Sequence, residues 1–172
     1  MELRKEILKE HSKAQCNAIV HRVGGSQEKF DELFHLFLHG DWMIAQRASW
    51  PVGYCVAAHP HFIDKHWKPF IENLRRTDLH DAVKRNSVKM LQFLTIPKKY
   101  QGDVMDTCFG FLEKPGEAVA VKVFSMTVLQ NLSRHYPDII PEIRLLIESQ
   151  LADQTAGFKS RAKHCLKQLA KQ

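Results

Sequence analysis

Apolar side chains recur at helical spacing along nearly the whole chain. After Ser26 they fall three and four residues apart, which places them on one side of a helix: Phe30, Leu33, Phe34, Phe37 and Leu38. Comparable stripes follow one another as far as Leu169. The pattern requires no strand anywhere, so the sequence predicts an all-α protein.

Glycine and proline divide these stripes into pairs. Gly40 separates the helices of the first pair, and Pro60, Pro97 and Pro137 stand where new pairs begin, because a missing N–H costs least at a helix start. We predict helix pairs at residues 26–59, 60–96, 97–136 and 137–172. Residues 1–25 are expected to form an N-terminal capping helix that ends at Gly24-Gly25. The pattern does not decide whether His11-Ser12 interrupts this helix. Residues 1–172 are predicted to be a single helical-repeat domain.

A basic residue early in each second helix sets the period of the chain. The four residues are Arg47, Arg85, Lys122 and Arg161, and the steps between them are 38, 37 and 39 residues. A period in this range is typical of helical solenoids, in which each unit covers the apolar face of its neighbour.

Paired helices at this period, with proline at the boundaries, resemble the HEAT/armadillo-like class of helical repeats. The resemblance implies a right-handed α-α superhelix, a HEAT-like solenoid, with the second helices on its concave side. Two stretches, 46–51 and 157–163, are also similar to a group of small bacterial proteins sometimes labelled adenylosuccinate lyase. That label is not supported, because the serine-rich signature loop of the lyases is absent and the chain is too short for their fold.

Charge differs between the two helices of each pair. The chain has a net charge of +6 and a pI near 9.2. The second-helix segments hold 11 Lys or Arg against 4 Asp or Glu, whereas the first-helix segments hold 9 against 12. A curved stack would turn this excess into a basic inner groove that attracts anions. The plainer interpretation is that these cations form solvated helix faces and structural contacts.

One second helix carries aromatic side chains beside its cation. Arg47, Trp50 and Tyr54 share one side of that helix, and tryptophan next to arginine is a composition enriched in binding hot spots. Trp50 could equally be covered by a neighbouring helix. We predict a non-catalytic scaffold that recognises an acidic or mixed protein partner. Its predicted binding residues are Arg47, Trp50, Tyr54, Arg85, Lys89, Lys122 and Arg161.

Two other functions remain possible from the sequence. The chain could bind nucleic acid, because HEAT-like DNA-alkylation-repair glycosylases, which it resembles in architecture, place aromatic, acidic and basic residues on a concave face. Trp50 and Arg47 could take two of those roles, but the acid is not identifiable. Alternatively, exposed aromatic residues could join two copies, so the chain could be a monomer or a homodimer.

Catalytic and metal sites are not expected. His35 and His39 stand four apart, and His59, His61 and His66 cluster, but no carboxylate or cysteine lies at ligand spacing beside them. The sequence has no nucleophile elbow and no phosphate loop. We therefore predict no cofactor and no metal. The spacing of the four cysteines is typical of reduced thiols, and the charged start and lack of an apolar span predict a cytoplasmic protein without a membrane segment.

Overall fold

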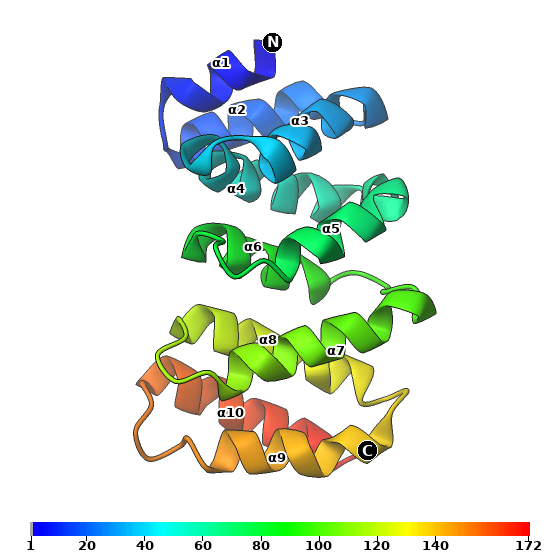
Figure 1. Ribbon diagram of the computed structural model, residues 1–172, viewed down its shortest axis with the longest axis vertical. Coiled ribbons are helices and arrows are strands. Elements are labelled where there is room, and N and C mark those ends of the chain that lie inside the picture. Colours follow the sequence, from blue (N-terminus) through cyan, green and yellow to red (C-terminus); the bar gives the residue numbers. More distant parts are fainter. Residues whose placement is uncertain (1) are drawn as a thin grey trace. The chain divides into compact units, whose positions relative to one another are not determined.

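The computed structural model describes residues 2–172, and this range contains α-helices and short 3-10 helices but no strand (Figure 1). This confirms the predicted all-α fold. The helices are α1 Glu2–Lys9, α2 Lys13–Val23, α3 Gln27–His39, α4 Trp42–Ala58, η1 Pro60–His66, α5 Trp67–Leu74, α6 Asp81–Leu91, α7 Lys98–Glu113, α8 Val119–Leu132, η2 Pro137–Ile139, α9 Ile140–Glu148 and α10 Ala156–Leu169.

The chain divides into two compact units, which we call unit 1, Met1–Met90, and unit 2, Leu91–Gln172. In unit 1, α3 packs on α4 and α2 packs on α4. In unit 2, α7 packs on α8 and α8 packs on α10. Second helices therefore form a layer within each unit. That the whole chain acts as one domain stays a prediction.

The helix boundaries of unit 1 follow from capping side chains. Ser12, Ser26 and Asp41 each accept a hydrogen bond from the backbone N–H three residues on, at 3.0, 3.3 and 3.0 Å. Such a bond satisfies one of the N–H groups that a helix leaves free at its start. The core of this unit is rich in phenylalanine, with the rings of Phe30 and Phe62 centred 4.9 Å apart.

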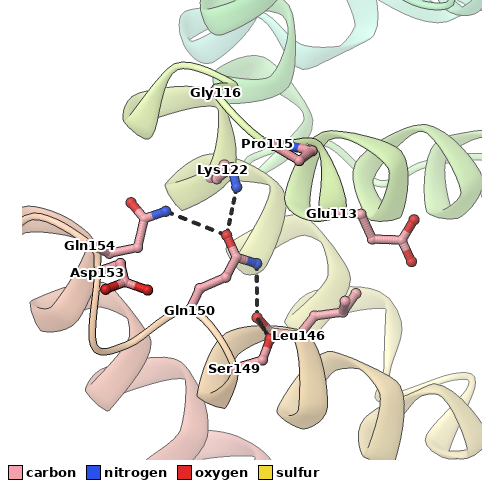
Figure 2. Close-up of a pocket in the computed structure, with 9 residues that line it drawn as sticks. All are labelled: Glu113, Pro115, Gly116, Lys122, Leu146, Ser149, Gln150, Asp153 and Gln154. Atoms are coloured by element: carbon pink, nitrogen blue, oxygen red, sulfur yellow. Dashed lines mark hydrogen bonds between the residues drawn. The ribbon is translucent and has the colours of Figure 1, made fainter.

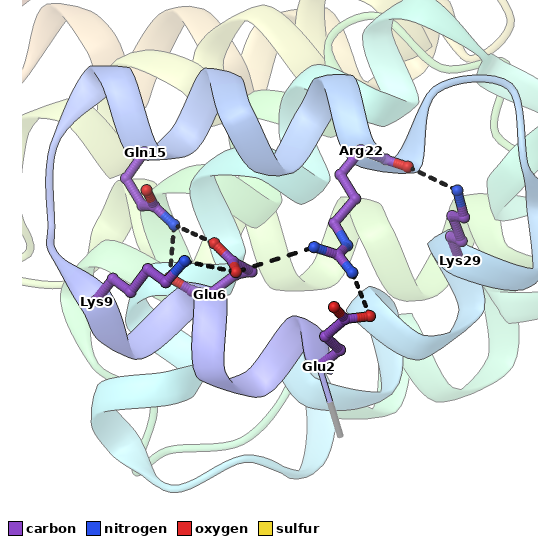
Figure 3. Close-up of polar contacts among 6 residues, drawn as sticks. All are labelled: Glu2, Glu6, Lys9, Gln15, Arg22 and Lys29. Atoms are coloured by element: carbon purple, nitrogen blue, oxygen red, sulfur yellow. Dashed lines mark hydrogen bonds and ion pairs between the residues drawn. The ribbon is translucent and has the colours of Figure 1, made fainter.

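The N-terminal segment forms two short helices, because the chain turns between Lys9 and the cap Ser12. Polar contacts join α1 to α2 (Figure 3). Gln15 Nε2 donates to Glu6 O at 2.7 Å, and Arg22 pairs with the Glu2 carboxylate. The pKa of Glu6 is lowered by its hydrogen bonds with Lys9 and Gln15. The terminal pair is thus held by charge as well as by buried apolar side chains.

Unit 2 begins its pairs at the predicted prolines. Pro97 occupies the N-cap position of α7, and Pro137 is the first residue of η2 ahead of α9. The turn between α7 and α8 contains Gly116, whose φ of 74° is accessible to glycine at little cost. The core includes Val121, Leu129, Ile143, Ile147 and Phe158, all buried.

Hydrogen bonds between residues about one period apart show the repeat directly. Asn86 Nδ2 donates to Ser49 Oγ at 2.8 Å over 37 positions. In unit 2, Gln150 Nε2 donates to Leu112 O at 3.0 Å over 38 positions, and Asn131 Nδ2 donates to the Gln92 carbonyl at 3.2 Å over 39. Within each unit, hydrogen bonds therefore join residues about one period apart, as in an α-α solenoid.

Candidate functional site

Arg47 lies on α4 and bonds to the end of α1. Its Nη1 donates to the backbone carbonyls of Leu8 at 3.1 Å and Ile7 at 3.4 Å. The last carbonyls of a helix lack partners in their own helix and carry partial negative charge, so a guanidinium is well placed there. The Arg47 side chain is half-buried and holds the terminal pair against α4.

Helices α4 and α6 run parallel and contact each other at two successive turns. Asn86 bonds Ser49, and a Cβ built on Gly53 would lie 3.7 Å from Met90 Cγ. The contacts therefore pair positions 49 and 53 with positions 86 and 90. Both helices advance clockwise by about 100° per residue when viewed from their N-termini. A side chain one position after a contact residue of α4 therefore points to the same side of the helix pair as a side chain one position before a contact residue of α6.

This geometry brings together four of the predicted binding residues. Trp50 and Tyr54 follow the α4 contact positions, and Arg85 and Lys89 precede those of α6. We call these four residues the α4–α6 face. Arg85 and Lys89 are exposed, and Tyr54 is 40% exposed. The face combines aromatic and cationic groups on one side of unit 1.

Trp50 is half-buried, between the two outcomes that its sequence allowed. Its ring centroid lies 6.1 Å from that of His11 and 6.5 Å from that of Tyr54. The indole is thus supported by neighbouring rings and still reaches the surface. This arrangement suits an anchor that is held in place before a partner arrives.

Lys122 occupies the matching repeat position in unit 2, but it is buried, with 3% of its surface exposed. Its Nζ donates to Gln150 Oε1 at 2.5 Å, and Gln150 Nε2 donates to the carbonyl of Leu146 (Figure 2). The same Nε2 also donates to the carbonyl of Leu112 at 3.0 Å. Burial lowers the pKa of Lys122, while the charge of Glu117 acts in the opposite direction. Lys122 therefore orients an amide that links α9 to α7.

A pocket of about 500 Å³ lies beside Lys122, between the α7–α8 turn and the chain that follows α9. Figure 2 shows the carboxylates of Glu113 and Asp153 on opposite sides of Lys122. The small exposed area of the Lys122 ammonium leaves little of it for a ligand to contact. The arrangement supports a structural role for this lysine more than a charge contact with a partner.

Arg161 lies half-buried on α10, within the most basic helix of the chain. The segment Ala156–Leu169 has no Asp or Glu, and its cations include exposed Lys159, Lys163 and Lys167. The positive charge of Arg161 partly offsets the effect of burial, which raises the pKa of Cys165 to about 11. The basic charge of unit 2 is therefore concentrated on its last helix.

The histidines and cysteines form no reactive cluster in the part of the chain that the structure describes. The rings of His35 and His39 are centred 4.7 Å apart, and His66 Nε2 lies 2.7 Å from Asp31 Oδ1. No group of three or more metal-ligating side chains occurs among residues 2–172. Burial raises the pKa of the Cys55 and Cys108 thiols to about 12, so thiolate chemistry is suppressed there.

The structure also shows polar residues that the sequence pattern did not single out. Asn86 and Gln150 each join neighbouring repeats through an amide. Neither carries a charge or belongs to an apolar stripe, so spacing alone could not identify them. The one signal in the sequence concerns Asn86, which is adjacent to the repeated basic residue Arg85.

Comparison with known proteins agrees with the architecture. No helix within residues 2–172 is both long and apolar enough to cross a membrane. Neither a curated protein nor a solved structure matches the chain significantly. The sequence model of the HEAT repeat domain matches residues 3–169. Because the match spans nearly the entire chain and the structure consists of stacked helix pairs, this protein belongs to the HEAT repeat family.

Proposed function

We propose that this HEAT repeat protein is a non-catalytic scaffold that binds an acidic segment of a partner protein through the α4–α6 face. HEAT repeats are commonly protein-interaction scaffolds and typically lack catalytic activity. The observation that carries the proposal is the placement of Trp50, Tyr54, Arg85 and Lys89 on one side of two parallel helices.

The chemistry of the face favours a mixed contact. Trp and Tyr offer large apolar areas with few rotatable bonds, so ordering them on binding costs little entropy. Arg85 and Lys89 stand one helical turn apart on α6, where they can meet carboxylates spaced along an extended or helical segment. Arg47 and Lys122 are left out of the proposed contact, because Arg47 is half-buried against the end of α1 and Lys122 is buried.

A photo-crosslinking experiment in cells tests the proposal. A benzophenone amino acid replaces Tyr54 in one variant and the exposed Lys163 of α10 in another. We expect the Tyr54 variant to capture a protein with an acidic segment at the crosslinked site. The added substitutions Arg85→Glu and Lys89→Glu should weaken capture by about tenfold or more, because two charge contacts with the partner are lost.

The matched control is the pair Lys163→Glu and Lys167→Glu, which changes the net charge equally on exposed positions of unit 2. This pair should leave capture by the Tyr54 variant unchanged. The proposal is wrong if both charge reversals reduce capture equally, or if the captured molecule is a nucleic acid. Capture of a second copy of the chain would instead support the homodimer and contradict a distinct acidic partner.

A further inference from the structure

The last helix of unit 2 carries three lysines on one exposed face. Because an α-helix advances by about 100° per residue, Lys159, Ser160, Lys163, His164 and Lys167 share an arc of roughly 140° on α10. All five residues are exposed, and we call them the α10 face. The helix contains no Asp or Glu, so the positive charge of the lysines is not neutralised within it.

The opposite side of α10 holds this face in place. Phe158, Ala162, Cys165 and Leu169 are buried where the helix packs against α8 and α9. Thr155 Oγ1 caps the helix by accepting a hydrogen bond from Phe158 N at 3.4 Å. The exposed residues of α10 include no apolar side chain larger than alanine. The lysines therefore project from a packed helix whose apolar side is already used within unit 2.

The two helices that pack against α10 do not cancel its charge. Lys122 is the one charged residue of α8, so that helix brings no carboxylate to the surroundings of α10. In α9, Arg144 pairs with Glu148 at 3.4 Å, and Glu142 is the other acid of the helix. Cations therefore outnumber acids in this part of unit 2, and an anionic partner is favoured there.

The composition of the α10 face selects among anionic partners. Protein interfaces depend on aromatic, methionine and arginine side chains, and lysine is depleted in them. A lipid surface would be held by charge alone, because α10 exposes no apolar side chain that enters the bilayer. Phosphate oxygens of nucleic acids, in contrast, are commonly bound by lysine ammonium and serine hydroxyl groups. The face is therefore best matched by a phosphate backbone.

The spacing of the lysines suits a regular row of phosphates. Lys159, Lys163 and Lys167 stand four residues apart, so they span roughly 12 Å along the helix. One DNA strand presents a phosphate per about 3.4 Å of its axis, so this row faces about three to four phosphates. Lys159 Nζ also donates to Ala152 O at 3.4 Å, a long contact that its flexible stem can exchange for a phosphate. The face has no Phe, Tyr or Trp ring to stack on unpaired bases, which favours a duplex.

We propose that the α10 face binds a nucleic-acid duplex through its phosphate backbone, without reading the base sequence. The three lysines contact phosphates of one strand, and the Ser160 hydroxyl and the His164 imidazole donate hydrogen bonds to phosphate oxygens beside them. No residue of the α4–α6 face takes part, so the inference does not depend on the proposed protein contact.

Fluorescence anisotropy of a labelled DNA duplex tests the inference. The full chain is titrated into two short duplexes of equal length and unrelated sequence, at about 50 and about 200 mM salt. We expect both duplexes to bind with the same Kd. Three phosphate contacts predict a slope of log K against log salt concentration of about −2.7, which lowers the affinity about 40-fold between the two conditions.

Variants connect binding to the α10 face. Lys163→Gln with Lys167→Gln removes two phosphate contacts and keeps residues that suit an exposed helix. This pair should raise the Kd about tenfold or more at the lower salt concentration and reduce the slope to about −0.9. Lys163→Arg with Lys167→Arg should retain binding. The matched control is Lys98→Gln with Lys99→Gln, an equal change in charge at exposed positions of α7, which should leave Kd and slope unchanged.

Three results would overturn the inference. The first is that neither duplex binds at the lower salt concentration. The second is an equal loss of binding in the two glutamine pairs, which would show that the overall charge of the chain attracts DNA. The third is tighter binding to phosphatidylserine vesicles or to polyglutamate than to the duplex, which would assign the face to a membrane or to an acidic protein. Thermal unfolding of each variant shows that a loss of binding is not a loss of fold.

Discussion

Units 1 and 2 use the same repeat position in different ways. In unit 1, Arg47 bonds backbone carbonyls of the preceding helix pair, whereas Arg85 is exposed. In unit 2, Lys122 is buried and bonds Gln150 of the following pair. A repeated residue thus keeps its place in the helix, while the surrounding side chains determine whether it bonds within the stack or stays exposed. Functional residues in such a chain must be chosen by surroundings, not by register.

Charge reversal at matched positions should separate the two roles most strongly. Lys122→Glu would bury a carboxylate against the acceptor oxygen of Gln150, at an expected cost of about 3–5 kcal/mol. Arg85→Glu should change stability by no more than about 0.5 kcal/mol, because its side chain is exposed. Hydrogen exchange of peptides from each unit measures both effects. Equal losses would show that burial does not distinguish these positions.

The turns of the two units differ in the space they leave around glycine. A Cβ on Gly40 would overlap Leu36 O and would come within 2.5 Å of Ile44 Cγ2. Gly40→Ala should therefore destabilise unit 1 by about 2 kcal/mol, as overpacked sites do. Gly116→Ala has room, and its cost should be about 1 kcal/mol, arising only from the positive φ. Thermal unfolding of both variants tests the order, and a larger loss at Gly116 would contradict it.

Removal of the Arg47 guanidinium should loosen the terminal helix of unit 1 and little else. Arg47→Met keeps most of the apolar stem but loses the bonds to the Leu8 and Ile7 carbonyls, at an expected cost of about 1 kcal/mol. Faster hydrogen exchange in Glu2–Lys9 is the expected signature. Arg85→Met is the matched control, and exchange in α1 should not respond to it.

Acid should weaken unit 1 through carboxylates that join separate helices. Burial raises the pKa of Asp31, but hydrogen bonds from Lys65, Gln27 and His66 outweigh this and lower it overall. The folded form of Asp31 therefore binds its proton more weakly than the unfolded form. Its contribution is complete above the ordinary pKa and is lost as the pH falls through about 4 and below. Hydrogen exchange of α3 and η1 between neutral pH and pH of about 3 follows the loss.

A substitution identifies the source of this acid sensitivity. Asp31→Asn should lower stability at neutral pH and flatten its dependence on pH in the acidic range. In unit 2, the pairs Lys114–Glu117 and Arg144–Glu148 are local to a turn or a single helix, so they do not join separate repeats. An unchanged pH profile in Asp31→Asn would show that another carboxylate is responsible.

The fold was predictable because it depends on patterns that each repeat copies. Apolar stripes, proline starts and the period of about 38 residues identified the helix pairs, and the match to HEAT repeats confirms that architecture. The break at Ser12 was less visible, since it rests on a single capping hydroxyl. The repeated pattern therefore predicts the internal helix pairs more clearly than the helices at the N-terminus.

The candidate site was predictable only in part. Side-chain spacing placed Trp50 and Tyr54 on one side of their helix, but the burial of Lys122 depends on Gln150, which lies 28 positions away. The pocket beside Lys122 depends on the path of the chain at the α7–α8 turn and after α9, which no periodic pattern specifies. Sites formed by turns thus require coordinates, whereas sites on a helix face follow from register.

The four buried cysteine thiols can report on transient opening of the helices that cover them. Cys16 and Cys55 belong to unit 1, and Cys108 and Cys165 belong to unit 2. An alkylating reagent can reach each sulfur only after the surrounding helices separate, so its rate of modification measures how often that event occurs. If the two units open together, all four rates will rise at the same denaturant concentration. If they open independently, Cys16 and Cys55 will respond at one concentration, and Cys108 and Cys165 at another.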